Sequence, residues 1–309
     1  MQGHITVFGS FVVDLMSRAP HLPVPGETVK GSMFKMGPGG KGFNQGVAAK
    51  KAGANMTMVT KLGQDAFGRI ALDTMKSLHM DTDKIFLSSQ DGTGTALIMV
   101  DENTSQNSIM VTSGACGKIT PQDISSIEGS IKNSQFLLTQ LETNLDAMEA
   151  VVSIAYRSGV KVVLNPAPIQ PISDDLLKMV YIITPNEVEA EILTGIPVDG
   201  EENAKKAAQY FFEKGIKNVV ITLGKRGVFV ADQYRQKIIP VPKVNVIDTT
   251  GAGDAFNGGL VTALAEGKDL WEAAKFANAL ASIAVTRLGT SPAMPYREEI
   301  DQFMEEHFM

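Results

Sequence analysis

Residues 136–187 read FLLTQLETNLDAMEAVVSIAYRSGVKVVLNPAPIQPISDDLLKMVYIITPNE and alternate short apolar runs with helical patterns. The runs at 136–142, 161–168 and 181–187 are typical of buried strands, whereas 145–159 carries apolar residues at helical spacing. This alternation predicts an α/β fold, in which a doubly wound, mostly parallel sheet has helices on both faces. Ligands of such sheets bind at the carboxyl ends of the strands.

Several polar residues and one glycine follow predicted strands directly, and these are the first candidates for a site: Asp14, Glu142, Asn165, Asn186, Gly224 and Asp254. Two segments, approximately 11–38 and 90–112, have strand-like patterns without helices between them. Within them, 28–36 is expected to be a half-exposed strand and 94–111 a hairpin. We expect one domain over residues 1–309, with these segments forming a small sheet that acts as a lid.

The composition excludes several classes of protein. A hydrophobic share of 44% and a charged share of 20% are close to globular averages, which argues against disorder. The net charge of −6 argues against a nucleic-acid partner, because phosphate binding needs a basic face. No apolar run approaches the ~18 residues of a membrane span. One cysteine, Cys116, permits no internal disulfide, which fits a reducing, cytoplasmic location.

The stretch DTTGAGDAFNGG at 248–259 is the most informative motif. An apolar run ends in a polar turn, and Gly251 and Gly253 open a helix whose bare N–H groups form an anion site. Asp254 lies beside that site, where a base for hydroxyl phosphorylation is needed. The alternative is that Asp254 only caps the helix, since aspartate is a common capping residue.

A second motif, GPGGKGFNQ at 37–45, contains the spacing G-x-G-x-x-G of dinucleotide-binding folds. The following strand, TMVTKLG at 57–63, carries no carboxylate for a ribose, so a dehydrogenase is excluded. Gly42 follows Lys41 where a Walker A loop has Ser or Thr, which excludes that loop as well. The simplest alternative is a glycine-rich turn at 37–42 that opens a helix.

Together, GGKGFNQ and DTTGAGDAFNGG resemble the two signatures of ribokinase-like sugar kinases. The resemblance covers nearly the whole chain, since QLETN, LNPAP, ITPNEVEAE, VVITLGKRGV, AVTRLG and PYREEI also look like segments of bacterial ribokinases. It implies an enzyme that uses ATP and magnesium to phosphorylate the 5-hydroxyl of a pentose, with the pentose and ATP as its small-molecule partners. It also implies a potassium ion beside the anion site and a homodimer formed through the lid.

The resemblance assigns roles residue by residue. Asp254 is implied as the general base, and the backbone of Gly251, Ala252 and Gly253 as the anion hole. The sugar would contact Val12, Asp14, Gly40, Lys41, Asn44, Glu142 and Asp254. The nucleotide would contact Asn186, Glu189, Thr222, Gly224, Gly227, Gly253 and Asn278, with Glu189 also holding magnesium through water. Potassium would bind Asp248, Thr250, Ala284, Arg287 and Gly289.

Two positions depart from the family pattern. Val12 stands where ribokinases usually carry an asparagine that faces the sugar, and deoxyribokinases carry an apolar residue there. Because valine cannot bond a 2-hydroxyl, we expect 2-deoxy-D-ribose to be favoured, with D-ribose as the alternative. Ala293 stands where many ribokinases supply a serine to the potassium site, and Ser291 is two residues out of register. A non-catalytic sugar or nucleotide sensor on the same fold is the third hypothesis.

Overall fold

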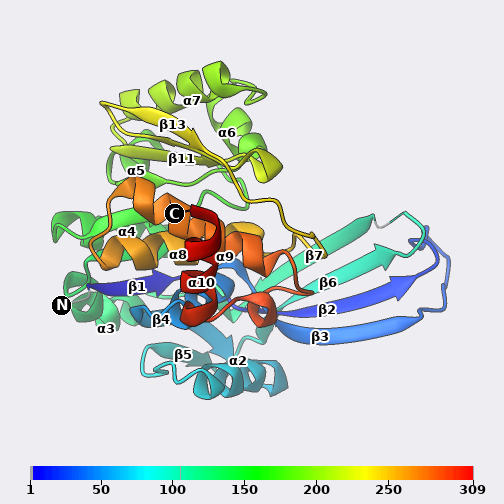
Figure 1. The fold of residues 1–309 in the computed structure, drawn as a ribbon. Coiled ribbons are helices and arrows are strands. Elements are labelled where there is room, and N and C mark those ends of the chain that lie inside the picture. Colours follow the sequence, from blue (N-terminus) through cyan, green and yellow to red (C-terminus); the bar gives the residue numbers. More distant parts are fainter. Residues whose placement is uncertain (1–2, 105, 309) are drawn as a thin grey trace.

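The structure is a computed structural model that describes residues 3–104 and 106–308. Within these residues it contains two sheets (Figure 1). The larger has nine strands in the order β13-β12-β11-β10-β9-β8-β1-β4-β5, and the smaller has four in the order β3-β2-β6-β7. Strands β10, β9, β8, β1, β4 and β5 pair in parallel, whereas β12 and β13 add an antiparallel hairpin at one edge. The mixed α/β architecture predicted from the sequence is confirmed.

The strands of the large sheet are β1 His4–Phe8, β4 Asn55–Gly63, β5 Ile85–Ser88, β8 Phe136–Thr139, β9 Lys161–Leu164, β10 Ile182–Ile183, β11 Asn218–Thr222, β12 Val228–Ala231 and β13 Gln236–Ile239. Those of the small sheet are β2 Val12–Ala19, β3 Met33–Gly39, β6 Thr93–Asp101 and β7 Asn107–Gly114. The α-helices are α1 Lys41–Lys51, α2 Ala66–Ser77, α3 Pro121–Lys132, α4 Leu145–Arg157, α5 Asp174–Lys178, α6 Glu187–Thr194, α7 Glu201–Glu213, α8 Ala252–Ala265, α9 Leu270–Ala284 and α10 Arg297–Phe308. Three short 3-10 turns span Ala115–Gly117, Gly224–Arg226 and Ser291–Ala293.

Both faces of the large sheet are buried, which explains why its strands are continuous apolar runs. In β8, Leu138 packs into the core beneath α1, α8 and α9, whereas Leu137 packs into the core beneath α3, α4 and α7. Val220 and Val219 of β11 divide between the same two cores. Because the parallel strands run in one direction, the loops that follow them lie at one edge of the sheet, and the candidate site lies there.

The small sheet projects from that edge and is built from the two segments that lacked helices in the sequence (Figure 1). Strands β6 and β7 form the expected antiparallel hairpin. The strand expected at 28–36 instead spans Met33–Gly39, and the glycine-rich turn expected at 37–42 is therefore wrong in part. The first three of those residues pair with β2, and only Gly40 separates β3 from α1. Extended glycines fit this strand because β2 places the Asp14 carboxylate directly beside Gly39.

Candidate active site

Asp254 lies in the first turn of α8, and its side chain is almost completely buried. The N-cap of α8 is Gly251, and the Asp254 carboxylate accepts no hydrogen bond from its own helix. Instead, Asn44 Nδ2 donates to Oδ2 at 3.2 Å and Gln45 Nε2 donates to Oδ1 at 3.0 Å, both from α1. The capping interpretation of Asp254 is therefore wrong, and the carboxylate faces the side-chain amides of α1.

Burial raises the pKa of Asp254, although the positive charge of Lys41 and the Gln45 hydrogen bond oppose the rise. A carboxylate with a raised pKa accepts a proton more readily near neutral pH. The backbone N–H of Ala252 donates to Thr249 O at 3.2 Å, whereas within the described residues the N–H of Gly253 has no acceptor. The Asp254 carboxylate and an N–H without an acceptor in the described residues therefore belong to consecutive residues at the start of α8.

A chain of buried amides fixes the Asp254 carboxylate. Gln45 Nε2 also donates to Asn165 Oδ1 at 3.1 Å, and Gln140 Nε2 donates to Gln45 Oε1 at 2.6 Å. Asn165 in turn donates to Thr184 O at 3.0 Å, so the chain runs across the ends of β8, β9 and β10. The sequence indicated Asn165 by its place after a strand and Gln45 by its motif, but it gave no sign of Gln140.

A second acidic group lies where the small sheet meets the large one. Glu142 Oε2 accepts from Lys41 N at 2.8 Å and from Ser10 Oγ at 2.5 Å. Burial, reinforced by the charges of Glu142 and Asp254, raises the pKa of Asp14 to about 6. Burial lowers the pKa of the Lys41 ammonium, but Asp254, Glu142 and Glu189 outweigh it and raise that pKa overall. These influences show that Asp14, Lys41, Glu142 and Asp254 share one electrostatic environment.

Val12 lies on the same face of β2 as Asp14, since successive side chains of a strand alternate between faces. Its register partners are Gly39 on β3 and Gly94 on β6, and its side chain is buried. With glycine as its register partner on both neighbouring strands, Val12 has no side chain directly beside it on β3 or β6.

A cavity of about 750 Å³ lies at the start of α8, where Ala252, Gly253 and Phe256 line it. Its lining includes most of the residues assigned to the nucleotide: Asn186, Thr222, Gly224, Gly227, Gly253 and Asn278. Glu189 is not among the lining residues, because it forms a reciprocal capping box with Asn186 at the start of α6. Burial raises the pKa of Glu189, and Lys41 and Asp254 both act on it, so it belongs to the same site without lining the cavity.

Comparisons with known proteins agree with this geometry. Residues 2–297 match the family model described as pfkB family carbohydrate kinase. The chain belongs to this family. It is 45% identical over 305 residues to a ribokinase of Haemophilus influenzae, covering 99% of each chain. It is 34% identical to a deoxyribokinase of Salmonella typhimurium, covering 97% of this chain and 98% of that one. A ribokinase of Arabidopsis thaliana, solved in complex with ribose and ATP, superimposes with a TM-score of 0.91 at 30% identity, covering 99% of each chain.

The chain is thus a ribokinase-like carbohydrate kinase, a phosphotransferase, and the fold and family expected from its motifs are confirmed. In this kinase three of the residues expected at a potassium ion, Asp248, Thr250 and Gly289, are joined by hydrogen bonds. Asp248 Oδ1 accepts from Thr250 N and Oδ2 from Gly289 N, both at 2.9 Å, and the N–H groups of Ile247 and Asp248 donate to Val285 O. Carbonyl and carboxylate oxygens suit an alkali cation.

The Ser291 hydroxyl is held by Asn44, to whose Oδ1 its Oγ donates at 2.6 Å. Ala293, where the family often has serine, is buried and apolar. The described part of the kinase holds no group of three or more His, Cys, Asp or Glu that could bind a metal by itself. No helix in residues 3–104 and 106–308 has both the length and the apolar character to cross a membrane.

Proposed function

We propose that this kinase transfers the γ-phosphoryl group of ATP to the 5-hydroxyl of a pentose, with Asp254 as the general base. The observation that carries the proposal is the place of Asp254. Its buried carboxylate lies one residue after Gly253, which lines the nucleotide-sized cavity, and its charge, like that of Glu142, helps to raise the pKa of Asp14. The relatives named ribokinase and deoxyribokinase, and the Arabidopsis complex with ribose and ATP, support the substrate class.

In this reaction the 5-hydroxyl gives its proton to Asp254 as its oxygen bonds to the γ-phosphorus, and the bond to the bridging oxygen of ADP breaks. The free N–H of Gly253 and the start of α8 stabilise the charge on the transferring group. Lys41, held near Asp254 and Glu142, adds a positive charge on the same side. Closure of the small sheet over the sugar excludes water, which prevents wasteful hydrolysis of ATP.

We assign the sugar to Val12, Asp14, Gly40, Lys41, Asn44 and Glu142, and the nucleotide to Asn186, Thr222, Gly224, Gly227, Gly253 and Asn278. Carboxylates and an amide suit a polyhydroxyl ligand because they accept or share hydroxyl hydrogen bonds. Magnesium, when bound with the phosphates, neutralises their charge, and Glu189 would hold it through water.

Within the pentoses we propose a preference for 2-deoxy-D-ribose. Val12 lies on the Asp14 face of β2 and offers no hydrogen bond, so a buried 2-hydroxyl there loses about 1–3 kcal/mol. The competing candidate is D-ribose, because the ribokinase relative is 45% identical and the deoxyribokinase only 34%.

The Asp254→Asn variant tests the reaction. It should abolish ADP release in a coupled assay with ATP and magnesium while sugar binding, measured by calorimetry, stays near the wild-type value. A sensor without catalysis would show no turnover even in the wild-type protein. Loss of sugar binding together with turnover would remove the role that we give to Asp254.

Substrate preference is tested by kcat/KM for the two sugars in wild type, Val12→Asn and Val12→Ala. The asparagine should raise the ratio of ribose to deoxyribose by roughly 5- to 150-fold, the range that 1–3 kcal/mol corresponds to. Val12→Ala, the control, removes apolar contact without adding a hydrogen-bonding group and should not favour ribose. A wild-type enzyme that prefers ribose would make the protein an ordinary ribokinase.

We further propose a potassium site formed by Asp248, Thr250, Ala284, Arg287 and Gly289. Its oxygen donors are brought together by the Asp248 hydrogen bonds, but Ala293 supplies no hydroxyl. Ala293→Ser should therefore increase the stabilisation that KCl, compared with NaCl, gives in thermal unfolding. Equal unfolding temperatures in the two salts for both proteins would rule out the site.

We also propose that the kinase is a cytoplasmic homodimer joined through the small sheet. Phe34, Met36, Leu97, Met99 and Met110 lie on the sheet face opposite Asp14, and each is at least 40% exposed. An apolar face of this kind marks an interaction surface. Light scattering at micromolar concentration should give a dimer, and Met110→Glu should give a monomer; a monomeric wild type would refute the proposal. The single free cysteine, Cys116, fits a reducing compartment.

A further inference from the structure

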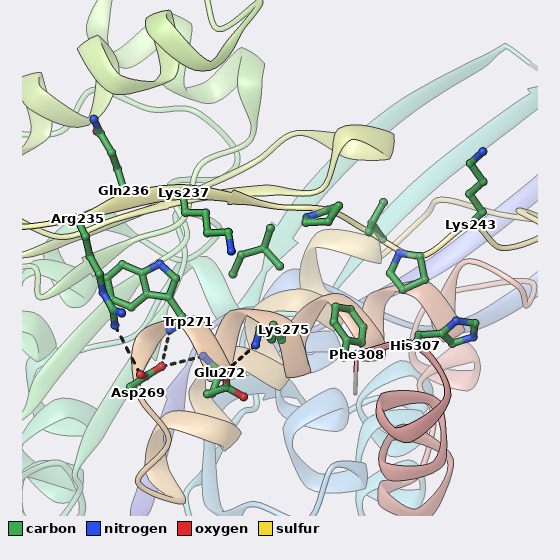
Figure 2. A pocket seen from close by; sticks show the side chains of 14 residues that line it. Arg235, Gln236, Lys237, Lys243, Asp269, Trp271, Glu272, Lys275, His307 and Phe308 are labelled. Carbon is green, nitrogen blue, oxygen red and sulfur yellow. Dashed lines mark hydrogen bonds and ion pairs between the residues drawn. The ribbon is translucent and has the colours of Figure 1, made fainter.

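A second large cavity lies outside the active site and is used by no step of the proposed reaction (Figure 2). It has a volume of about 890 Å³ and lies between β13, the start of α9 and the end of α10. The apolar part of its wall consists of Ile239, Pro240, Val241, Pro242, Trp271 and Phe308. Since the active-site cavity measures about 750 Å³, this groove is large enough for a molecule of nucleotide size.

The charges of the groove favour an anion. Arg235 lies 3.3 Å above the Trp271 ring and pairs with Asp269 at 3.6 Å, and Glu272 pairs with Lys275 at 2.7 Å. Both acidic residues of the lining therefore have basic partners. Lys237 and a second lysine of the wall, Lys243, have no ion-pair partner within residues 3–104 and 106–308, in a chain whose net charge is −6.

Three donors line the groove. Figure 2 shows the Lys237 ammonium group directed toward the space beside the Trp271 indole, the Lys275 ammonium group directed toward Glu272, to which it donates one of its three hydrogens, and Lys243 pointing away toward the other end. The indole N–H of Trp271 has no acceptor in the described part of the chain. A phosphate group, with several acceptor oxygens, matches two ammonium groups and one N–H better than a single carboxylate does.

We propose that this groove is a second binding site for a nucleoside phosphate, separate from the catalytic cavity. The phosphate lies between Lys237, Lys275 and the Trp271 N–H, and the base and sugar lie along the wall of Pro240, Pro242 and Phe308. A planar base gains binding free energy from contact with an apolar and aromatic surface, while a few polar groups hold the charged phosphate end of the same ligand.

The two cavities share one wall. Val241, Pro242 and Lys243 line both, and Asn278 of the catalytic cavity donates to Ile239 O at 3.4 Å. Pro240 and Pro242 each fix their own φ and so restrict the backbone of this segment. Occupation of the groove therefore changes the affinity of the catalytic cavity for its nucleotide, and the effect is reciprocal.

The test is the binding stoichiometry of the non-hydrolysable nucleotide AMP-PNP with the full chain, measured by equilibrium dialysis. Wild type should bind two equivalents, one tight and one weak. Lys237→Glu and Lys275→Glu should each weaken the second site by roughly 10- to 100-fold, the loss expected for a charge-assisted hydrogen bond, and leave the tight site in place. The control Lys76→Glu, an exposed lysine on α2, should retain both.

One equivalent in wild type at millimolar AMP-PNP would overturn the proposal, and so would a second equivalent that survives both charge reversals. Binding of no nucleotide at all would instead refute the proposed function, so the two failures are distinguishable. Coupling between the two cavities is tested by measuring the KM for ATP at increasing AMP concentration. AMP competes with ATP at the catalytic cavity in every variant, so coupling would appear as an additional change in KM that wild type shows and Lys237→Glu lacks. Identical dependence of KM on AMP in wild type and Lys237→Glu would refute the coupling.

Discussion

Gln45 is the residue whose replacement tests most directly how the base is tuned. It is fully buried, and its Nε2 donates at 3.0 Å to Oδ1 of Asp254, the proposed base. Gln45→Met keeps the approximate shape and removes the donor. A hydrogen bond to a charged group contributes about 1.5–3 kcal/mol, and each pKa unit corresponds to about 1.36 kcal/mol. The pKa of Asp254, already raised by burial, should therefore rise by roughly one to two further units.

The direction of the effect on activity follows from the role of the carboxylate. Only the ionised form accepts the proton, so a higher pKa moves the acidic limb of the kcat/KM profile to higher pH by the same one to two units. Activity at neutral pH falls, and alkaline pH restores much of it. KM for the sugar changes little, because Gln45 contacts Asp254, Asn165 and Gln140 rather than the proposed sugar pocket.

The assay is the pH profile of ADP release, with thermal unfolding measured in parallel. Thr6→Val is the matched control, since it breaks a buried hydrogen bond of 2.7 Å to Ser134 away from the site. It should lower the unfolding temperature without moving the profile. If Gln45→Met lowers kcat equally at every pH, then Gln45 only supports the packing, and the tuning argument is wrong.

Three further predictions follow from single contacts. Because the pKa of Asp14 is about 6, sugar affinity should fall as the pH drops below 6, and Asp14→Asn should flatten that dependence in calorimetric titrations. Lys61→Met leaves Asp123 without its 2.7 Å partner in a largely buried pair, so denaturant unfolding should show a loss of about 3 kcal/mol, partly recovered by adding Asp123→Asn. Gly42→Ala places a Cβ 2.5 Å from Gly9 Cα, so α1 must shift, and kcat/KM should fall even where the circular dichroism spectrum is unchanged.

The layered fold could be predicted from the sequence because each parallel strand is an apolar run followed by a helical pattern. The strand–helix alternation did not predict the hairpin of β12 and β13. Val228–Ala231 and Gln236–Ile239 have no helix between them and so break the strand–helix rhythm. Their signal is the short polar turn around Asp232, whose carboxylate accepts from the N–H groups of Tyr234 and Arg235. The second cavity is lined partly by residues of this hairpin, so it could not be predicted from the sequence either.

The candidate site also contains residues that could be predicted from the sequence and residues that could not. Residues within continuous motifs, such as Lys41, Asn44 and Asp254, could be placed together because the resemblance covers both signatures. Gln140 could not, because a glutamine at the end of an apolar strand is also an ordinary exposed residue at a loop. Its function becomes visible only when β8 and α1 are packed and its amide meets that of Gln45. Long-range polar contacts of this kind depend on tertiary packing, which local pattern does not determine.

The proposed potassium site shows that a residue's position in the sequence is weaker evidence for its role than its hydrogen bonds in the structure. Ser291 is two residues from the position where the family often has its serine, and a small shift of the chain could be thought to bring it into place. The structure gives its hydroxyl another partner, Asn44, which also bonds Asp254. Moving Ser291 toward the cation would leave the Asn44 oxygen unpaired in a buried site, at a cost of about 1–3 kcal/mol. The serine therefore helps to orient the proposed sugar pocket and base, and any cation at Asp248 and Gly289 depends on carbonyl and carboxylate oxygens alone.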